Sequence, residues 1–508
     1  MRTILICAIL AFGVITSSVS EAAQPARFNY QAKLTDSGGL PLNGVHTLTI
    51  RLYQGGTAGS ANSGTQVYQE TATPTFTNGV ANHVVGTGTG QIPGALTASM
   101  LNTSSDIFLQ IAVDDVSNVV LPRTRLESVP FSILSADGEA RIPISQPGGG
   151  SFPITISQPG SYYLTGNLTD VGPGAGVSIT TSGVKLDLNG YSIIGTGGGG
   201  TLGVACNTAG VKNLEVCNGR ITNCNIGISF NNVSNAWVHD MNLSGNQNVG
   251  VRVGAGAIVE DCVANDLSSP TSNVYGIFVS SDSTVRQCQV ANIQSAAASS
   301  NAIGISGGIG ASVLNCSASN VGSIGTNTSV SGITVSNNSR VEGCIARGNY
   351  NSGSSGVTIG IAAGPDSLIL NNVSTNNSAA DSDSNGIRVG NSSLVSGNDV
   401  TSNTAVGASN FGVGIAISST TRVENNNVVG NIGVSGGTGY GIYARFSSSS
   451  GNVIVKNTTI GHTTAGIRCE NTSGANYHGE NIQKETTPFS QASMVNVAGT
   501  GDRADVAF

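Results

Sequence analysis

The stretch from Gly304 to Cys344 reads GISGGIGASVLNCSASNVGSIGTNTSVSGITVSNNSRVEGC, and it contains two signals that recur along most of the chain. The first is a glycine followed by a branched aliphatic residue. Ten such pairs follow one another between residues 227 and 469, with steps of 23, 26, 28, 28, 28, 26, 28, 27 and 25 residues. A period of this length is typical of stacked supersecondary units, none of which buries its apolar face alone. The ten glycines are Gly227, Gly250, Gly276, Gly304, Gly332, Gly360, Gly386, Gly414, Gly441 and Gly466, and Gly176 and Gly203 extend the series towards the N-terminus.

The second signal is an aliphatic residue followed three positions later by cysteine or asparagine, or by methionine in the case of Val238, and it is in phase with the first. Its aliphatic members are Leu186, Leu214, Val238, Val259, Val285, Val313, Val341, Ile369, Val395, Val423 and Ile454. No segment shows a sustained 3.6-residue apolar period, which argues against helices. The sequence therefore predicts an all-β fold, a right-handed parallel β-helix of about 12 coils over residues 154–475, which rises about 4.8 Å per coil.

The remaining segments differ in composition from the repeat. Residues 1–22 have the features of a secretory signal peptide, with Arg2 before an apolar run too short to span a bilayer. Residues 24–140 alternate apolar and polar positions, which predicts a small antiparallel β-sandwich. We expect a linker over 141–153 and a C-terminal cap or tail over 476–508. No later stretch reaches membrane-spanning length, so the predicted location is secreted, extracellular or at the cell surface.

Composition narrows the range of partners. Only 10% of residues are charged, the net charge is −7, and no basic cluster exists. Nucleic-acid binding therefore has no electrostatic basis. A weakly acidic surface rich in Asn, Ser and Thr suits polysaccharide or a cell-surface glycan, although a surface that is merely polar enough for solubility explains the composition equally well. The oligomeric state stays open.

Four cysteines occupy the same place in four successive repeats: Cys262, Cys288, Cys316 and Cys344. Stacked side chains at this position form an internal ladder, which asparagine continues from Asn372 onward. Neighbouring rungs lie within the Cα distance that a disulfide tolerates, but parallel side chains in register are poorly aimed at each other. We favour buried thiols, and disulfides remain the alternative.

Four stretches resemble known bacterial sequences. Residues 30–36, together with Arg51-Leu52-Tyr53, resemble an N-terminal module of exported bacterial proteins. Residues 156–164 and 186–191 resemble the opening coils of bacterial right-handed β-helix repeat proteins of the pectate-lyase-like superfamily. That superfamily includes pectate lyases, polygalacturonases, alginate epimerases and phage tailspikes. The resemblance implies a carbohydrate partner without implying a particular reaction.

The position after each aliphatic residue of the second signal is predicted to face outward, and five ionisable residues open this series: Asp187, Glu215, His239, Glu260 and Arg286. Carboxylates on adjacent coils would match a retaining glycosidase pair or a cation site. These five are therefore the candidate catalytic residues, while Asp240, Glu260 and Asp261 are the candidate ligands for calcium. Mixed charges that keep an exposed strand face soluble are the alternative. No cofactor is required by any motif.

Aromatic and basic residues suggest two further surfaces. The candidate carbohydrate-binding residues are Trp237, His239, Arg252 and Arg286. A second series, two positions after the repeated glycines, holds Arg252, Phe278, Arg388, Tyr443 and Arg468. With Tyr440, Phe446, His462 and Tyr477, it predicts an aromatic-basic binding face near the C-terminal end. The alternative, which we favour, is that Tyr477 and Phe489 cap the last coil.

Three functions remain compatible with these patterns. The favoured one is a secreted solenoid that binds or scaffolds polysaccharide without catalysis. The alternatives are a polysaccharide lyase or glycoside hydrolase that acts on acidic glycans, and a structural unit of a surface filament or adhesin.

Overall fold

The computed structural model divides the chain into two compact units, residues 1–140 and 141–508. It describes residues 27–36, 38–97, 100, 106–126, 141–445, 449–470, 476–484, 489–490, 494–496 and 506–507. The predicted signal peptide lies outside these ranges. Within them, no helix has the length and apolar composition needed to cross a membrane.

The N-terminal unit consists of small antiparallel sheets around one hydrophobic core. Strand β1 (Phe28–Lys33) pairs with β6 (Val80–Val85), and the two-residue strands β2 (Gly44–Val45) and β5 (Thr75–Phe76) pair with each other. A five-stranded sheet has the order β7-β4-β3-β8-β9. Its strands are β3 (Leu48–Gln54), β4 (Thr65–Ala72), β7 (Thr89–Ile92), β8 (Ile107–Val113) and β9 (Val119–Arg125). Side chains of β1, β3, β6 and β8 share the same core.

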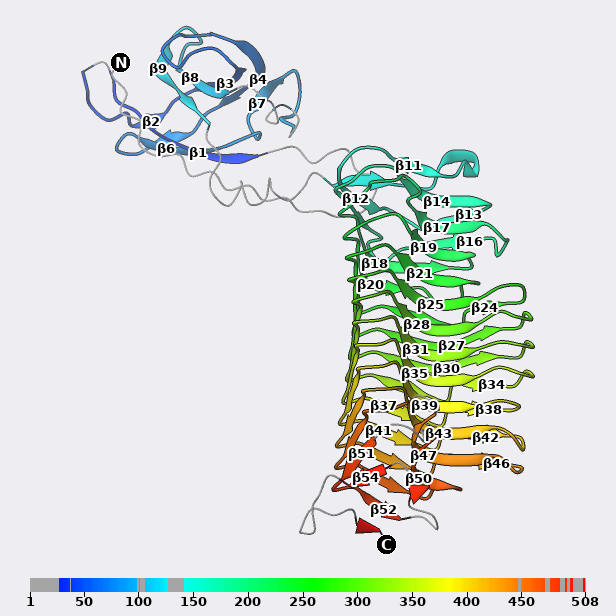
Figure 1. Cartoon of the computed structure of the whole chain (residues 1–508). Coiled ribbons are helices and arrows are strands. Elements are labelled where there is room, and N and C mark those ends of the chain that lie inside the picture. The colour runs from blue at the N-terminus through cyan, green and yellow to red at the C-terminus, as the bar shows by residue number, and fades with distance from the viewer. Residues whose placement is uncertain are drawn as a thin grey trace. The chain divides into compact units, whose positions relative to one another are not determined.

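The second unit is a parallel β-solenoid of about 12 turns, which confirms the predicted right-handed parallel β-helix. One wall is a 14-stranded parallel sheet in which each strand pairs with its counterpart in the next coil, and Figure 1 shows these strands stacked one after another. They are β11 (Ile154–Ile156), β14 (Gly174–Ile179), β17 (Thr201–Ala205), β19 (Ile226–Phe230), β21 (Val249–Val253), β25 (Val274–Val279), β28 (Ala302–Gly307), β31 (Val330–Val335), β35 (Thr358–Ala363), β39 (Ser384–Val389), β43 (Phe411–Ile417), β47 (Thr438–Ala444), β50 (Ala465–Cys469) and β53 (Phe489–Ser490).

The repeated Gly-aliphatic pair lies in this wall, and its aliphatic member points into the core. Ile305 stacks on Ile277 and Ile333 in register, and all three are fully buried. The preceding glycine is needed because the coils approach closely there. A Cβ atom on Gly304 would lie 2.4 Å from the carbonyl oxygen of Gly332. In each repeat, the aliphatic residue therefore contributes to the core, and the glycine allows neighbouring coils to approach closely.

The remaining walls form a 32-stranded sheet that holds the second signal. The strands that carry the candidate residues are β15 (Val184–Asp187), β18 (Glu215–Thr222), β20 (Trp237–Asn242), β22 (Ile258–Glu260) and β26 (Thr284–Arg286). The same position is continued by β29 (Ser312–Leu314), β32 (Arg340–Glu342), β36 (Leu368–Leu370), β40 (Leu394–Ser396), β44 (Arg422–Glu424), β48 (Val453–Val455) and β51 (Asn476–Gly479).

A left-handed residue ends most of these short strands and turns the next side chain inward. Asp261 and Asn315 have φ values of 50° and 52°, a conformation that Asp and Asn tolerate better than most residues. The following residue, such as Cys262 or Cys316, is then buried in the core. The eight cysteines of the described residues are all buried and free. The interpretation of the cysteine ladder as thiols therefore agrees with the structure.

Asparagine replaces cysteine in this ladder from Asn372 onward, as predicted. The side-chain amide of Asn372 donates to the carbonyl oxygen of Val341 at 3.0 Å and to Oδ1 of Asn398 at 3.0 Å. A second buried ladder was not predicted. It comprises Asn349, Asn377, Asn403, Asn431 and, at its end, His462.

The solenoid extends beyond both predicted bounds. Strand β10 (Ile142–Ile144) pairs in parallel with β12 (Gly160–Leu164), so the predicted linker over 141–153 contains the first strand of the sheet. At the other end, β51 and β52 (Ile482–Lys484) continue the stack within the segment predicted as a cap or tail. Both bounds were missed because these strands lie outside the run of regular repeats.

Candidate functional site

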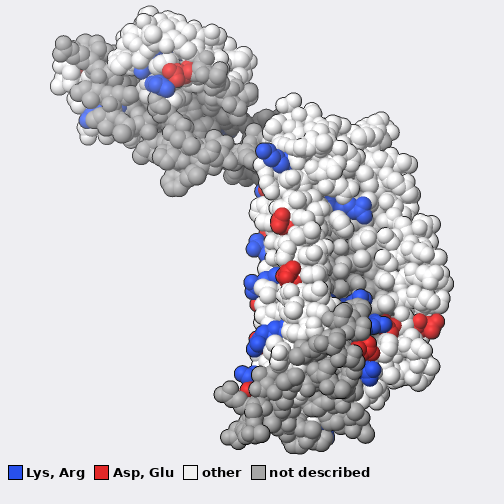
Figure 2. All heavy atoms as spheres, in the orientation of Figure 1, with Lys and Arg blue, Asp and Glu red and all other residues white. Residues whose placement is uncertain are grey.

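The five candidate catalytic residues lie in two columns on the outer face of the 32-stranded sheet. We call the stacked positions Asp187, Cys217, His239, Glu260, Arg286, Leu314, Glu342, Leu370, Ser396, Glu424 and Val455 the outer column. A flanking column two residues earlier begins with Lys185, Glu215, Trp237 and Ile258. Figure 2 shows charged side chains following one another along one edge of the solenoid, while most of the visible surface is uncharged.

The predicted place of Glu215 was wrong by two residues. Glu215 pairs with Lys185 and Trp237 in the flanking column, and Cys217 stands between Asp187 and His239 in the outer column. The series was read from Leu214, whereas Val216 is the residue in register with Leu186 and Val238. A shift of two residues leaves the same face inward, so alternation alone does not reveal it.

Trp237 and His239 form the aromatic centre of the site. Their rings stack with centroids 4.2 Å apart and an interplanar angle of 29°. The indole Nε1 donates to Oε1 of Glu260 at 2.6 Å, and the indole remains 40% exposed. The ring is thus fixed on one side and open to solvent on the other.

Ionic contacts connect His239 to its neighbours. Its Nδ1 lies 2.7 Å from Oδ2 of Asp240, and its Nε2 lies 3.2 Å from Oε1 of Glu215. The same Glu215 oxygen is 2.8 Å from Nζ of Lys185. Neither the contact of Asp240 with the imidazole nor the role of Lys185 was predicted. A signal for Lys185 was present, since it precedes Asp187 by two residues and shares its face.

Glu260 is held as a carboxylate. Arg286 donates to its Oε2, and Trp237 donates to Oε1. The hydrogen bond from Arg286 lowers the pKa of Glu260, against a smaller opposing effect of burial. The same contact raises the pKa of Arg286. A general acid in glycoside hydrolysis needs a raised pKa, so Glu260 is poorly suited to that role.

Each carboxylate of the outer column has a basic partner. Asp187 pairs with Arg141, Glu260 with Arg286, Glu342 with Arg340 and Glu424 with Arg422. Successive carboxylates stand three coils apart, or about 14 Å at 4.8 Å per coil. The expected pair of carboxylates on adjacent coils is therefore not formed in this column, because Cys217, His239, Arg286 and apolar residues occupy the positions between them.

The candidate calcium ligands are not drawn together as a group. Within the described part of the chain, three or more ligating side chains converge at Glu215, Cys217 and His239, whose ligand atoms lie within 4.8 Å of one another. The oxygens of Glu260 are engaged by Trp237 and Arg286. Asp240 and Asp261 occupy left-handed corners, with φ of 53° and 50°.

Arg252 lies apart from the other carbohydrate-binding candidates, on β21 of the 14-stranded wall. Its guanidinium is 5.4 Å from the ring centroid of Phe278 and 5.9 Å from that of Tyr275. These side chains adjoin a hollow of about 270 Å³ lined by Arg252, Tyr275, Ile226, Asn248, Val249, Ser272 and Asn273. Trp237, His239 and Arg286 are thus brought together, and Arg252 is not.

The predicted aromatic-basic face near the C-terminal end is packed rather than open. Tyr440 and Tyr443 are 3% and 1% exposed, and Arg468 lies 5.3 Å from the ring centroid of Tyr440. His462 is buried, with Nε2 3.1 Å from the carbonyl oxygen of Val428. Tyr477 belongs to the other sheet, and Phe446 lies outside the described residues. These residues therefore do not form the predicted open binding face, and Tyr477, which was predicted as an alternative cap, is 40% exposed.

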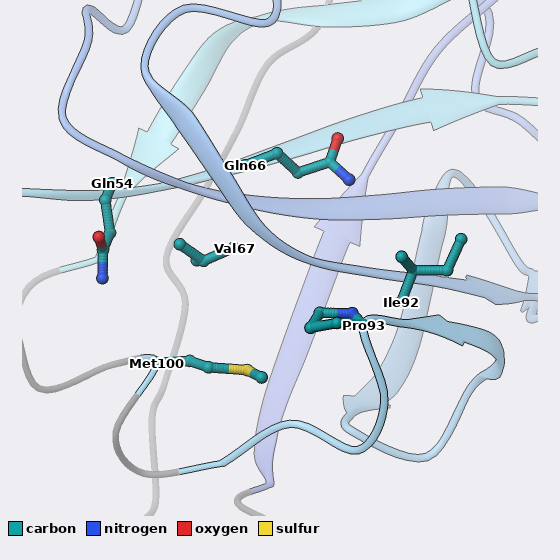
Figure 3. A pocket seen from close by; sticks show the side chains of 6 residues that line it. All are labelled: Gln54, Gln66, Val67, Ile92, Pro93 and Met100. Atoms are coloured by element: carbon teal, nitrogen blue, oxygen red, sulfur yellow. The ribbon is translucent and has the colours of Figure 1, made fainter.

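A hollow of about 480 Å³ in the N-terminal unit has a different character. Figure 3 shows the six residues that line it: Gln54, Gln66, Val67, Ile92, Pro93 and Met100. None of these side chains titrates, so this hollow offers shape and amide groups without acid, base or nucleophile.

Comparison with known proteins gives similarity in two forms. Residues 29–123 match the family described as "Domain of unknown function (DUF8740)". The search of curated proteins found no match.

Several solved structures resemble the chain. The A-module of mannuronan C-5 epimerase AlgE4 from Azotobacter vinelandii has a TM-score of 0.37 and 12% identity, over 67% of this chain and 91% of that chain. The tailspike protein of E. coli bacteriophage HK620, solved in complex with a pentasaccharide, has a TM-score of 0.31 and 13% identity, over 74% and 73%. With similarity this distant, the function of this chain is derived from its own residues.

Proposed function

We propose that this protein is a secreted or cell-surface solenoid that binds polysaccharide without catalysis, through the surface around Trp237. The observation that carries the proposal is the indole itself. It is 40% exposed, yet it is held by a stacking contact with His239 and a hydrogen bond to Glu260. A charged face kept only for solubility has no use for a fixed, half-exposed tryptophan.

The fixed indole suits a sugar ring for a thermodynamic reason. Aromatic rings supply a large apolar surface with a polar edge. A side chain that is already ordered loses little conformational entropy on binding, so more of the contact energy appears as affinity. The open side of the indole can therefore receive the apolar face of a pyranose.

Polar groups that can bond sugar hydroxyls are connected to the ring through His239 and Glu260. Glu215, Asp240 and Glu260 supply acceptors, while Lys185 and Arg286 supply donors. Because these acidic and basic groups pair with one another, the local charge is nearly balanced. The surface therefore favours a neutral or weakly charged glycan over a strongly acidic one.

The pairing of charges also supports binding over turnover. The outer-column carboxylates stand about 14 Å apart, whereas retaining and inverting glycosidases need separations of about 5–5.5 Å and 6.5–9.5 Å. Both oxygens of Glu260 are occupied by protein donors. Because these carboxylate oxygens already bind protein donors, we also propose that glycan binding does not depend on calcium. Removal of calcium with a chelator should then leave glycan binding unchanged.

The test is retention of the full-length protein on gels or arrays of neutral and acidic polysaccharides. Trp237→Ala should reduce retention at least tenfold. Tyr477→Ala is the matched control, because Tyr477 is also 40% exposed and lies in the same flanking column but far from the charged network. Equal retention of the wild type, Trp237→Ala and Tyr477→Ala would refute binding at Trp237.

The remaining outcomes separate the alternatives. Retention that is lost in Tyr275→Ala but kept in Trp237→Ala would place the glycan at the hollow beside Arg252. If the wild-type protein binds no glycan with or without calcium, the structural filament or adhesin role is favoured.

A further inference from the structure

Glu215, Cys217 and His239 bring three different metal-ligating atoms to one place. Their ligand atoms lie within 4.8 Å of one another. Glu215 and Cys217 are two residues apart on β18 and therefore project to the same face, and His239 is the partner of Cys217 on the next coil. The convergence follows from the register of two adjacent strands rather than from a flexible loop.

The histidine is oriented for coordination through Nε2. Its Nδ1 lies 2.7 Å from the Asp240 carboxylate, so Nδ1–H donates there, and the other face of the imidazole stacks on Trp237. A carboxylate behind a histidine is the usual support of a metal-bound imidazole, because it fixes the ring and its tautomer. Nε2 then faces the group formed by Glu215 and Cys217.

The contact between His239 and Glu215 also calls for a cation. If Nδ1 carries the proton that Asp240 accepts, a neutral imidazole presents a lone pair on Nε2 to the Glu215 oxygen 3.2 Å away. Two acceptors at this distance repel each other unless a positive charge lies between them. Either a second proton on the imidazole or a metal ion satisfies both atoms.

The position of Cys217 favours a metal ion over a second proton on the imidazole. It is only 4% exposed although its position in the sheet faces outward. Asp187 is its partner on the preceding coil, and the Glu215 carboxylate converges with its thiol. An imidazolium–carboxylate pair makes no use of a thiol here, whereas a divalent metal would be bound by it and would neutralise the surrounding negative charge.

We propose that Glu215, Cys217 and His239 form a site for a divalent, borderline-soft metal ion of the Zn²⁺ class. Zinc accepts one sulfur, one nitrogen and one oxygen ligand, and three protein ligands leave a fourth position for water or a ligand oxygen. Neighbouring ligands of tetrahedral zinc lie roughly 3.3–3.7 Å apart. To reach that spacing, the partly exposed Glu215 side chain would move toward Cys217 and His239 and would exchange its contact with Lys185 for the metal. This site shares Glu215 and His239 with the proposed glycan surface, but the metal titration below gives its result whether or not a glycan binds.

The experiment is a titration of the chelator-stripped, reduced full-length protein with Co²⁺, followed by competition with Zn²⁺. We expect one equivalent to bind, with a thiolate-to-cobalt charge-transfer band in the near ultraviolet that Zn²⁺ abolishes. Cys217→Ser and His239→Ala should remove the band. Cys206→Ser, which changes another buried free thiol, should retain it.

A further variant tests the orientation of the histidine. Asp240→Asn should weaken Co²⁺ binding about 10- to 100-fold while the band persists at saturation, as expected for a residue that positions a ligand. Far-ultraviolet circular dichroism confirms that each variant is folded. Absence of the band in the folded wild type, or its persistence in folded Cys217→Ser, would overturn the proposal and leave an imidazolium–carboxylate pair.

Discussion

Val341 and Ser396 occupy opposite sides of equivalent short strands, and they show how much depends on the direction of one side chain. Val341 is fully buried in the stack of aliphatic residues, and Ser396 lies in the outer column. Val341→Asp would place a carboxylate in a thin apolar core, at a cost of about 3 kcal/mol or more in the free energy of unfolding.

Ser396→Ala should change the same quantity by less than about 0.5 kcal/mol, because the site is on the surface. Urea denaturation of the two variants and the wild type is the measurement. Equal shifts for Val341→Asp and Ser396→Ala would refute the assignment of inward and outward positions.

Glu260 should make stability depend on pH. The hydrogen bond from Arg286 lowers its pKa below the ordinary value of 4.5. A lowered pKa in the folded state stabilises the protein above the pKa of the unfolded state, and this contribution is lost as pH falls through the folded value. Glu260→Gln should therefore be less stable than the wild type near pH 7, and the difference should shrink below about pH 4.5. A difference that stays constant from pH 7 to pH 3 would contradict the pairing.

The asparagine ladder is the corresponding feature at the scale of the element. Asn398 donates to the carbonyl oxygen of Ile369 and to Asn426, and it accepts from the backbone N–H of Asn372. Asn398→Ala leaves buried donors and acceptors without partners and should cost roughly 2–4 kcal/mol. The exposed Asn427 is the control, and Asn427→Ala should have little effect on the unfolding midpoint. A small effect of both changes would show that the ladder does not hold neighbouring coils together.

The cysteine rungs predict thiol chemistry that depends on the fold. The hydrogen bond that the Cys316 thiol donates to Cys288, reinforced by burial, raises the pKa of Cys316 to about 12, and only the thiolate is reactive. We expect negligible reaction of the native protein with a thiol reagent at pH 8, and reaction of all eight cysteines of the second unit after unfolding. Fewer than eight reactive thiols in the unfolded, unreduced protein would reveal disulfides.

The regular spacing of the repeat determined which positions could be predicted from the sequence. From Val238 onward the repeat is even, and the outer-column positions of His239, Glu260 and Arg286 follow from counting. Before it, Leu214 fits the pattern through Cys217, whereas Val216, the buried residue that is in register, is followed three positions later by Gly219. The pattern therefore indicated the wrong residue of β18. The second asparagine ladder was missed because its members stand among many other asparagines.

At the scale of the whole molecule, the repeat specifies a long stack of coils but not its chemistry. The sequence placed charged residues on one face, whereas their pairing arises from side-chain reach across neighbouring coils. Arg141 joins Asp187 from the segment taken as a linker, and Arg252 lies on the other wall. Only the folded chain separates the network around Trp237 from the packed tyrosines near the C-terminal end.

The most direct test of the central claim, binding without catalysis, is to incubate the protein with every glycan that retains it and to measure new reducing ends and unsaturated uronides over time. We expect a stable complex and no release of product at any calcium concentration. Product release by the wild type that is abolished in Glu260→Ala would contradict it and establish a lyase or hydrolase.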